Sequence, residues 1–130
     1  MRKLFFVTII ALTTISTFSQ STSEAPKQNI STDSKVAFRL FSTRNMHTFI
    51  KLDTRNGQMW QVQWDIKSSQ FETPLSLITL VTKKEENNGR FFLYPTTNIF
   101  NFILLDQIDG RVWQVQWSTE VKERMVVPIN

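Results

Sequence analysis

The side chains with the richest chemistry in this sequence stand in two copies of one pentapeptide, Trp-Gln-Val-Gln-Trp, at residues 60–64 and 113–117. Alternate side chains of a β-strand point to opposite faces, so each copy places its tryptophans and valine on one face and its glutamines on the other. Exposed tryptophans could stack on sugar rings, whereas buried ones need acceptors for their indole N–H groups. We expect the buried role, because each tryptophan pair shares its face with a valine.

The glutamine face is the candidate binding surface. Glutamines on a strand can form an ordinary solvated surface, but phenylalanines flank these amides and would complete a polar and aromatic binding strip. In the second copy the face also becomes apolar, since Phe92 replaces Arg39. Leu104 likewise replaces Lys51. An exposed apolar patch of this kind marks an interaction site, unless a neighbouring strand covers it. The candidate binding residues are Phe49, Gln61, Gln63, Phe92, Phe102, Leu104, Gln114 and Gln116.

Two aspartates and one histidine are the candidates for catalysis. Asp53 and Asp106 occupy equivalent positions, and a pair of carboxylates is what glycoside hydrolysis requires. Each also stands directly before a tight turn, where an aspartate accepts hydrogen bonds from turn amides, and we expect this turn role. His47 is accompanied by no Gly-x-Ser-x-Gly elbow. The sequence therefore predicts no enzyme and no catalytic residue, and a hydrolase is the least favoured alternative.

Composition excludes several kinds of site and partner. Without cysteine there is no disulfide, no thiolate metal site and no cysteine nucleophile, and one histidine excludes a multi-histidine metal site. We therefore expect no metal and no cofactor. The formal net charge is +4, and Arg2 and Lys3 contribute two of those charges in a segment that we expect to be removed. The charge that remains after this removal gives no reason to expect a nucleic-acid partner.

Residues 1–19 are typical of a secretory signal peptide. Arg2 and Lys3 precede an apolar run over 4–18, and small residues end the segment near the expected cleavage site. The run is shorter than the ~20 residues that a spanning helix needs, although a retained anchor is the alternative. Residues 20–35 are polar and are predicted to form a flexible leader. We expect a periplasmic or secreted protein with no membrane span after cleavage.

An internal duplication organises the rest of the chain, residues 36–130. Residues 38–64 realign on 91–117 at a constant offset of 53, with 14 identities in 27 positions and no gap. Alternating apolar residues and regularly spaced turns predict strands throughout. The predicted strands are 37–42, 48–54, 58–65, 76–82, 90–95, 100–107, 111–118 and 124–129. The sequence thus predicts an all-β domain with two four-stranded antiparallel units, 36–82 and 89–130, related by a pseudo-two-fold and forming a small barrel or sandwich.

The turn of each central hairpin predicts the register of its strands. A three-residue loop, Arg55-Asn56-Gly57, fits a type I turn followed by a left-handed glycine. This loop places Leu52 opposite Trp60, and the same loop type in the second unit places Leu105 opposite Trp113. The tryptophan face would then be the core in both units.

The segment 102–113 and its counterpart 49–60 share the pattern Leu-Asp-x-x-x-Gly-x-x-Trp, which resembles the hairpin of quinoprotein-type β-propeller blades. The whole chain resembles small exported proteins of gut Bacteroidetes, which implies an envelope or extracellular location. Two units are fewer than the four or more blades of a closed propeller, and no quinone or metal-binding residue carries over. The prediction for function is a non-catalytic binding or interaction module for a glycan or protein partner. The alternative is a structural subunit of a homo-oligomer whose sheets assemble edge to edge.

Overall fold

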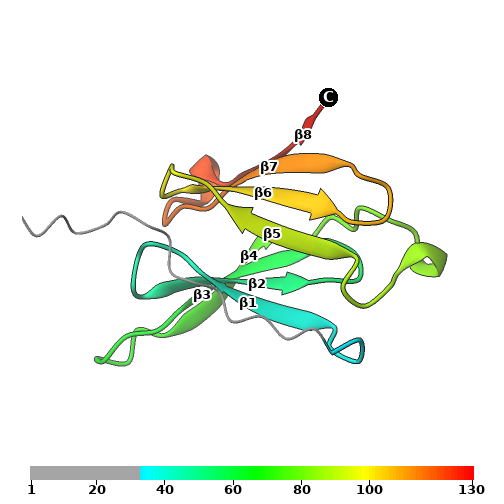
Figure 1. The fold of residues 1–130 in the computed structure, drawn as a ribbon. Helices are drawn as coiled ribbons and strands as arrows, with labels where there is room; N and C mark the ends of the chain where they lie inside the picture. Colours follow the sequence, from blue (N-terminus) through cyan, green and yellow to red (C-terminus); the bar gives the residue numbers. More distant parts are fainter. Residues whose placement is uncertain (1–32) are drawn as a thin grey trace, which may run out of the picture.

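The computed structural model describes residues 33–130, in which the chain forms two stacked four-stranded sheets (Figure 1). The predicted signal peptide and the leader up to residue 32 lie outside the described residues. The first sheet holds the strands β1 (Phe38–Ser42), β2 (Thr48–Asp53), β3 (Met59–Gln63) and β4 (Phe71–Ser76) in that order. The second holds β5 (Phe91–Pro95), β6 (Asn101–Asp106), β7 (Val112–Gln116) and β8 (Met125–Ile129). All pairs are antiparallel, so the predicted all-β class and the sandwich are confirmed, and no barrel closes.

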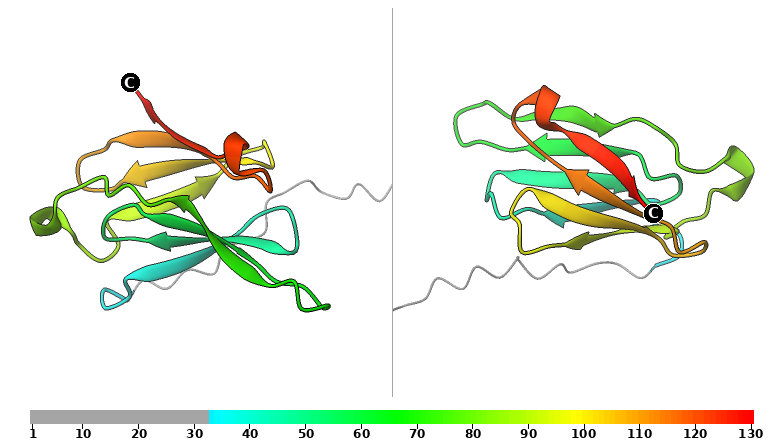
Figure 2. Two further views of the ribbon diagram at one scale, coloured as in Figure 1. Left: turned by 180° about the vertical axis from the view of Figure 1, so that it is seen from behind. Right: turned by 90° about the horizontal axis from the view of Figure 1, so that it is seen from above.

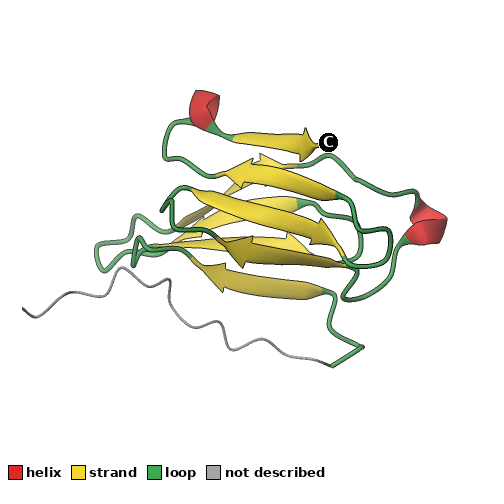
Figure 3. Ribbon diagram, turned by 45° about the horizontal axis from the view of Figure 1, so that its top comes forward, coloured by secondary structure: helices red, strands yellow, loops and turns green. Residues whose placement is uncertain are grey.

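Two single turns of 3-10 helix, η1 (Lys83–Glu85) and η2 (Val121–Glu123), lie at the ends of the strands (Figure 3). They do not lie over the broad faces of the sheets, which overlap each other when seen from above (Figure 2). Each sheet therefore has one face against the other sheet and one face directed outward. The two sheets fall inside the predicted repeat units 36–82 and 89–130.

Seven strands lie within two residues of their predicted bounds, and β4 does not. The sequence predicts a strand at 76–82, but the strand is Phe71–Ser76. It is an edge strand of its sheet, where Pro74 needs no ladder N–H. The apolar residues that follow leave the sheet and cross the turn before β3, where the Leu80 N–H donates to the Asn56 carbonyl at 2.8 Å. Val81 is buried and Leu80 packs against the core, so this end of the apolar run is covered without being a strand, whereas Leu77 and Ile78 are exposed.

The predicted hairpin register is wrong by one residue in both units. Leu52 lies opposite Met59, and Trp60 lies opposite Lys51. The turn contains four residues rather than three, because the Gly57 N–H donates to the Asp53 carbonyl at 3.0 Å. The second unit repeats this bond between Gly110 and Asp106 at 2.8 Å. A shift of one residue moves every side chain of a strand to the other face relative to its partner.

The register decides which side chains form the core. The first sheet contributes Phe41, Ile50, Leu52, Met59 and Leu75, and the second contributes Phe91, Leu93, Phe102, Leu104, Trp113, Val115 and Trp117. The predicted core role is confirmed for the tryptophans of the second unit. It is wrong for those of the first unit, where Trp60 is half-buried and Trp64 is exposed.

The two units meet through opposite faces of their sheets. Ile50 and Leu52 are buried, whereas their counterparts Ile103 and Leu105 are only half-buried on the outer face. A two-fold axis would bury the same positions in both units, because such an interface joins identical surfaces. The predicted pseudo-two-fold is therefore wrong, and the second sheet is stacked on the first in the same orientation.

Candidate functional site

The predicted binding strip does not form, because its residues are divided between the core and the surface. Phe102 and Leu104, expected on an exposed patch, are buried in the core. Phe92 packs against the core with its ring edge-on to Phe41, the centroids 5.3 Å apart. The burial of Phe102 and Leu104 follows from the four-residue turn, which puts both on the same face as the second unit's tryptophans.

The predicted glutamines also separate. Gln61 is buried between the sheets, where its Nε2 donates to the Ser118 carbonyl at 3.0 Å and its Oε1 accepts from the Ser118 N–H at 3.1 Å. Gln61 therefore joins the two sheets. Gln63 is half-buried, and Phe49 is half-buried on the outer face of the first sheet. Gln114 and Gln116 lie on the outer face of the second sheet.

The first outer face is the set of outward side chains of the first sheet. Its members are Phe38, Leu40, Phe49, Lys51, Trp60, Val62, Trp64 and Glu72. The rings of Phe38 and Trp60 lie 6.3 Å apart, and the Lys51 ammonium lies 4.9 Å from the Trp60 ring centre. Lys51 also forms an ion pair with Glu72. The Arg55 guanidinium, which is paired with Asp53, lies 5.4 Å from the Phe38 ring centre. The face is thus an aromatic surface that carries two ion pairs.

The second outer face carries no charged side chain on its strands. Its outward positions are Phe92, Tyr94, Asn101, Ile103, Leu105, Val112, Gln114, Gln116, Met125, Val127 and Ile129. Tyr94, Val127 and Ile129 are exposed. The two glutamine amides are bound within the chain, Gln114 to Asn101 Oδ1 and Gln116 to the Glu123 carbonyl, both at 2.8 Å. A sheet face without charges that exposes apolar side chains in this way is characteristic of an interaction surface.

Asp53 and Asp106 have the expected turn role. The Arg55 N–H donates to Asp53 Oδ1 at 3.0 Å, and the Ile108 N–H does the same for Asp106 at 3.0 Å. Asp106 is also buried in a bidentate ion pair with Arg90, with two bonds of 3.0 Å. Burial raises the pKa of Asp106, but hydrogen bonds from Arg90, from the turn amides and from Arg111 outweigh burial and lower it to about 2. Both carboxylates are therefore committed to structure.

His47 has the same structural role as its counterpart in the second unit. Its ring packs against that of Trp64 with the centroids 4.8 Å apart and the planes at 50°, as the rings of Phe100 and Trp117 do at 5.2 Å and 48°. The Nδ1 atom of His47 lies 3.2 Å from the Trp64 carbonyl oxygen. The histidine therefore replaces an aromatic side chain that covers an indole.

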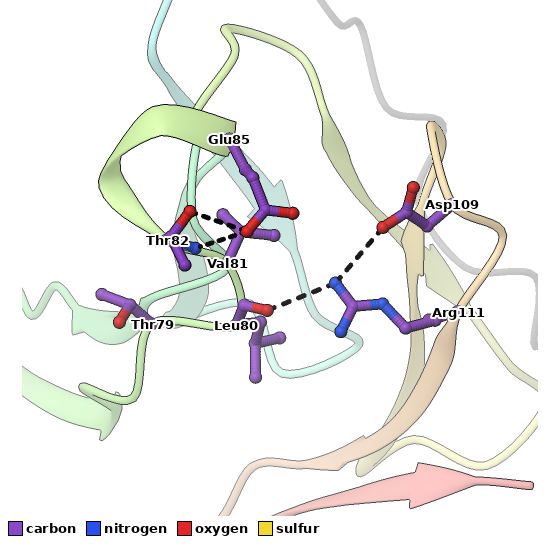
Figure 4. Close-up of a pocket in the computed structure, with 7 residues that line it drawn as sticks. All are labelled: Thr79, Leu80, Val81, Thr82, Glu85, Asp109 and Arg111. Carbon is purple, nitrogen blue, oxygen red and sulfur yellow. Dashed lines mark hydrogen bonds and ion pairs between the residues drawn. The ribbon is translucent and has the colours of Figure 1, made fainter.

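A pocket of about 580 Å³ opens between the segment 79–82 and the turn before β7 (Figure 4). Arg111 reaches across it to the Leu80 carbonyl at 3.3 Å and lies 3.8 Å from the carboxylate of Asp109. Glu85 accepts from the Thr82 hydroxyl at 2.7 Å, and these bonds to Thr82 hold the pKa of Glu85 below its ordinary value. Arg111 and Glu85 are each already bound by neighbouring groups of the chain, so the outer faces are the stronger candidates for a site.

Within residues 33–130, no group of three or more histidine or acidic side chains is arranged to hold a metal ion. Nor does any helix in this part of the chain have the length and apolar character needed to cross a bilayer. No known protein family, curated protein or solved structure matches the chain.

Proposed function

We propose that this chain is a non-catalytic interaction module that binds a protein partner through the outer faces of its sheets. The observation that carries the proposal is the second outer face, on which apolar and amide side chains lie together without a charge. The centre of a protein interface is depleted of charged residues and enriched in aromatic side chains and methionine. Tyr94 and Met125, which are both exposed, supply such side chains.

A protein partner fits this face better than a glycan does. Sugar hydroxyls need polar side chains around an aromatic platform, but the amides of Gln114 and Gln116 already bind their own chain. Tyr94 is the one exposed aromatic side chain among the outward positions of these strands. Apolar burial is therefore what the face can contribute to binding.

Site-specific photo-crosslinking in the producing cells tests the proposal. A photoreactive amino acid at Val127, on the second outer face, should give a protein adduct of defined mass. The matched controls are Ile66 and Ile108, which are at least as exposed but lie in loops. The same adduct from all three positions, or no adduct from Val127, would refute the proposal. Specific binding to a glycan array without any protein adduct would replace the protein partner with a glycan.

Export to the periplasm or the exterior belongs to the same proposal. It rests on the charged start, the short apolar run and the small residues near position 19. Intact-mass measurement on native material should find a chain that begins at or near Gln20. A mass that includes Met1 would show that the segment is retained.

A further inference from the structure

The outer surface of each sheet is the counterpart of the buried surface of the other sheet. Leu93 is 0% exposed, and its counterpart Leu40 is 52% exposed. In the other direction, Phe41 is 0% exposed and its counterpart Tyr94 is 43% exposed. The first outer face therefore corresponds to the inner face of the second sheet, and the second outer face corresponds to the inner face of the first sheet.

The first outer face already has the side-chain arrangement of its buried counterpart. The rings of Phe38 and Trp60 are 6.3 Å apart at 56°, and those of Phe91 and Trp113 are 6.0 Å apart at 53°. The indole N–H of Trp64 donates to the Met46 carbonyl at 2.9 Å, as the indole N–H of Trp117 does to Ile99. These side chains would need no rearrangement to enter an interface like the one inside the chain, which lowers the entropic cost of binding.

We infer that the partner is a second copy of this chain, whose first outer face docks on the second outer face of its neighbour. The inference rests on the proposed function and repeats the contact that joins the two sheets within one chain. The surfaces that meet are unlike, so the assembly is head to tail. Such a contact produces a closed ring or an open filament, not a two-fold dimer. The homo-oligomer predicted as an alternative is then stacked face to face, not edge to edge.

The contact inside the chain specifies the bonds expected between copies. The Phe91 N–H donates to the Thr54 carbonyl at 2.8 Å and links the units. At an offset of 53, the equivalent bond joins the Phe38 N–H of one copy to the Gln107 carbonyl of its neighbour. The two acceptor residues, Thr54 and Gln107, have the same backbone setting. The Thr54 N–H donates to the Ala37 carbonyl, and the Gln107 N–H donates to the Arg90 carbonyl, both at 2.8 Å.

A second expected link comes from the pentapeptides. Gln61 holds both backbone groups of Ser118 within the chain. Its counterpart Gln114 would exchange its bond to Asn101 Oδ1 for the backbone of Asp65 in the neighbouring copy, as one amide bond replaced by others. This arrangement gives a physical reason why the two pentapeptides are identical. Inside the chain, the first unit supplies a glutamine and the second unit supplies the tryptophans. Between copies, the second unit would supply the glutamine and the first unit the tryptophans.

Lys51 is the main difference between the two contacts. Its counterpart Leu104 is fully buried, whereas Lys51 is charged and paired with Glu72. Burying this ion pair costs solvation, so the contact between copies is weaker than the contact inside the chain. The Lys51→Leu/Glu72→Val double variant, which removes both charges of the pair, should tighten self-association about tenfold or more.

Variants that block one face each test the head-to-tail arrangement in the full chain. Leu40→Lys blocks the first outer face, and Tyr94→Lys blocks the second. Both sites are exposed, so circular dichroism and the denaturation midpoint should match the wild type. By size exclusion with light scattering, the wild type should associate, each variant alone should be a monomer, and an equal mixture should form a two-chain complex. Ile108→Lys, in a turn, is the control and should associate like the wild type.

Three results would overturn the inference. The first is a wild type that stays monomeric up to about 1 mM. The second is a result in which one blocked variant still self-associates and the mixture of the two variants forms no two-chain complex. That pattern is expected when each face binds the same face of another copy. The third is a Lys51→Leu/Glu72→Val variant that associates no more tightly than the wild type, and this measurement holds even if a lysine variant unfolds. A Val127 adduct with a different protein, together with a monomeric wild type, would leave the proposed function standing and remove this inference alone.

Discussion

Alanine at Gly57 should cost more stability than alanine at Gly110, although the two glycines occupy the same place in the duplicated turn. Both have positive φ, +85° and +76°. A Cβ in this region costs about 1 kcal/mol. At Gly57 the added Cβ would lie 2.7 Å from Leu80 Cδ1 and 3.1 Å from its Cγ. At Gly110 no described atom beyond the chain neighbours lies within 4 Å.

The magnitude follows from these contacts. Gly110→Ala should lower the free energy of unfolding by about 1 kcal/mol, from backbone strain alone. Gly57→Ala adds overpacking, and because the end of the Leu80 side chain can turn away, the addition is at the low end, about 1 kcal/mol. Urea denaturation measures both. With a slope of about 2 kcal/mol per molar, the two midpoints should differ by about 0.5 M at equal slope.

The Leu80→Ala background provides the control for this comparison. Removing the side chain that meets the added Cβ should make Gly57→Ala and Gly110→Ala equally costly, as a double-mutant cycle would show. Equal costs in the wild-type background, or an excess that survives Leu80→Ala, would refute the assigned path of residues 77–81 over the turn.

Two further predictions concern the core and the buried carboxylate. Trp113→Ala should cost about 3–5 kcal/mol and Trp60→Ala about 1 kcal/mol by denaturant titration, because one member of this equivalent pair is in the core and the other is on an outer face. Equal losses would contradict the stacking. Asp106 has a pKa of about 2 in the folded chain against an ordinary value of 3.8, so it contributes about 2 kcal/mol above pH ~4, which is lost as the pH falls toward 2. Asp106→Asn should flatten the stability curve in that window, and parallel curves for wild type and variant would exclude this origin.

The duplication and most of the strands could be predicted from the sequence. Apolar alternation and the spacing of turn residues are local properties, and they place seven strands within two residues. The fourth strand could not be placed this way. An apolar run that crosses a turn and packs against the core, as Leu80 and Val81 do, has the same composition as a strand.

The hairpin register required the three-dimensional structure. Three-residue and four-residue turns ending in glycine share almost the same sequence, and the choice depends on the bond from the Gly57 N–H to the Asp53 carbonyl. In the second unit the equivalent bond, from the Gly110 N–H to the Asp106 carbonyl, moved Phe102 and Leu104 from the predicted binding strip into the core. The predicted site was lost for the same reason.

By itself, the sequence determined that this protein is a duplicated β structure in which Trp, Val and Gln alternate along the matching strands. Tertiary structure alone decided which of the two faces of each sheet is buried. Both faces of each sheet carry apolar side chains, so alternation defines two faces without ranking them. Stacking in one orientation buried Ile50 in the first unit and Trp113 in the second, and it left their counterparts, Ile103 and Trp60, on the outer faces.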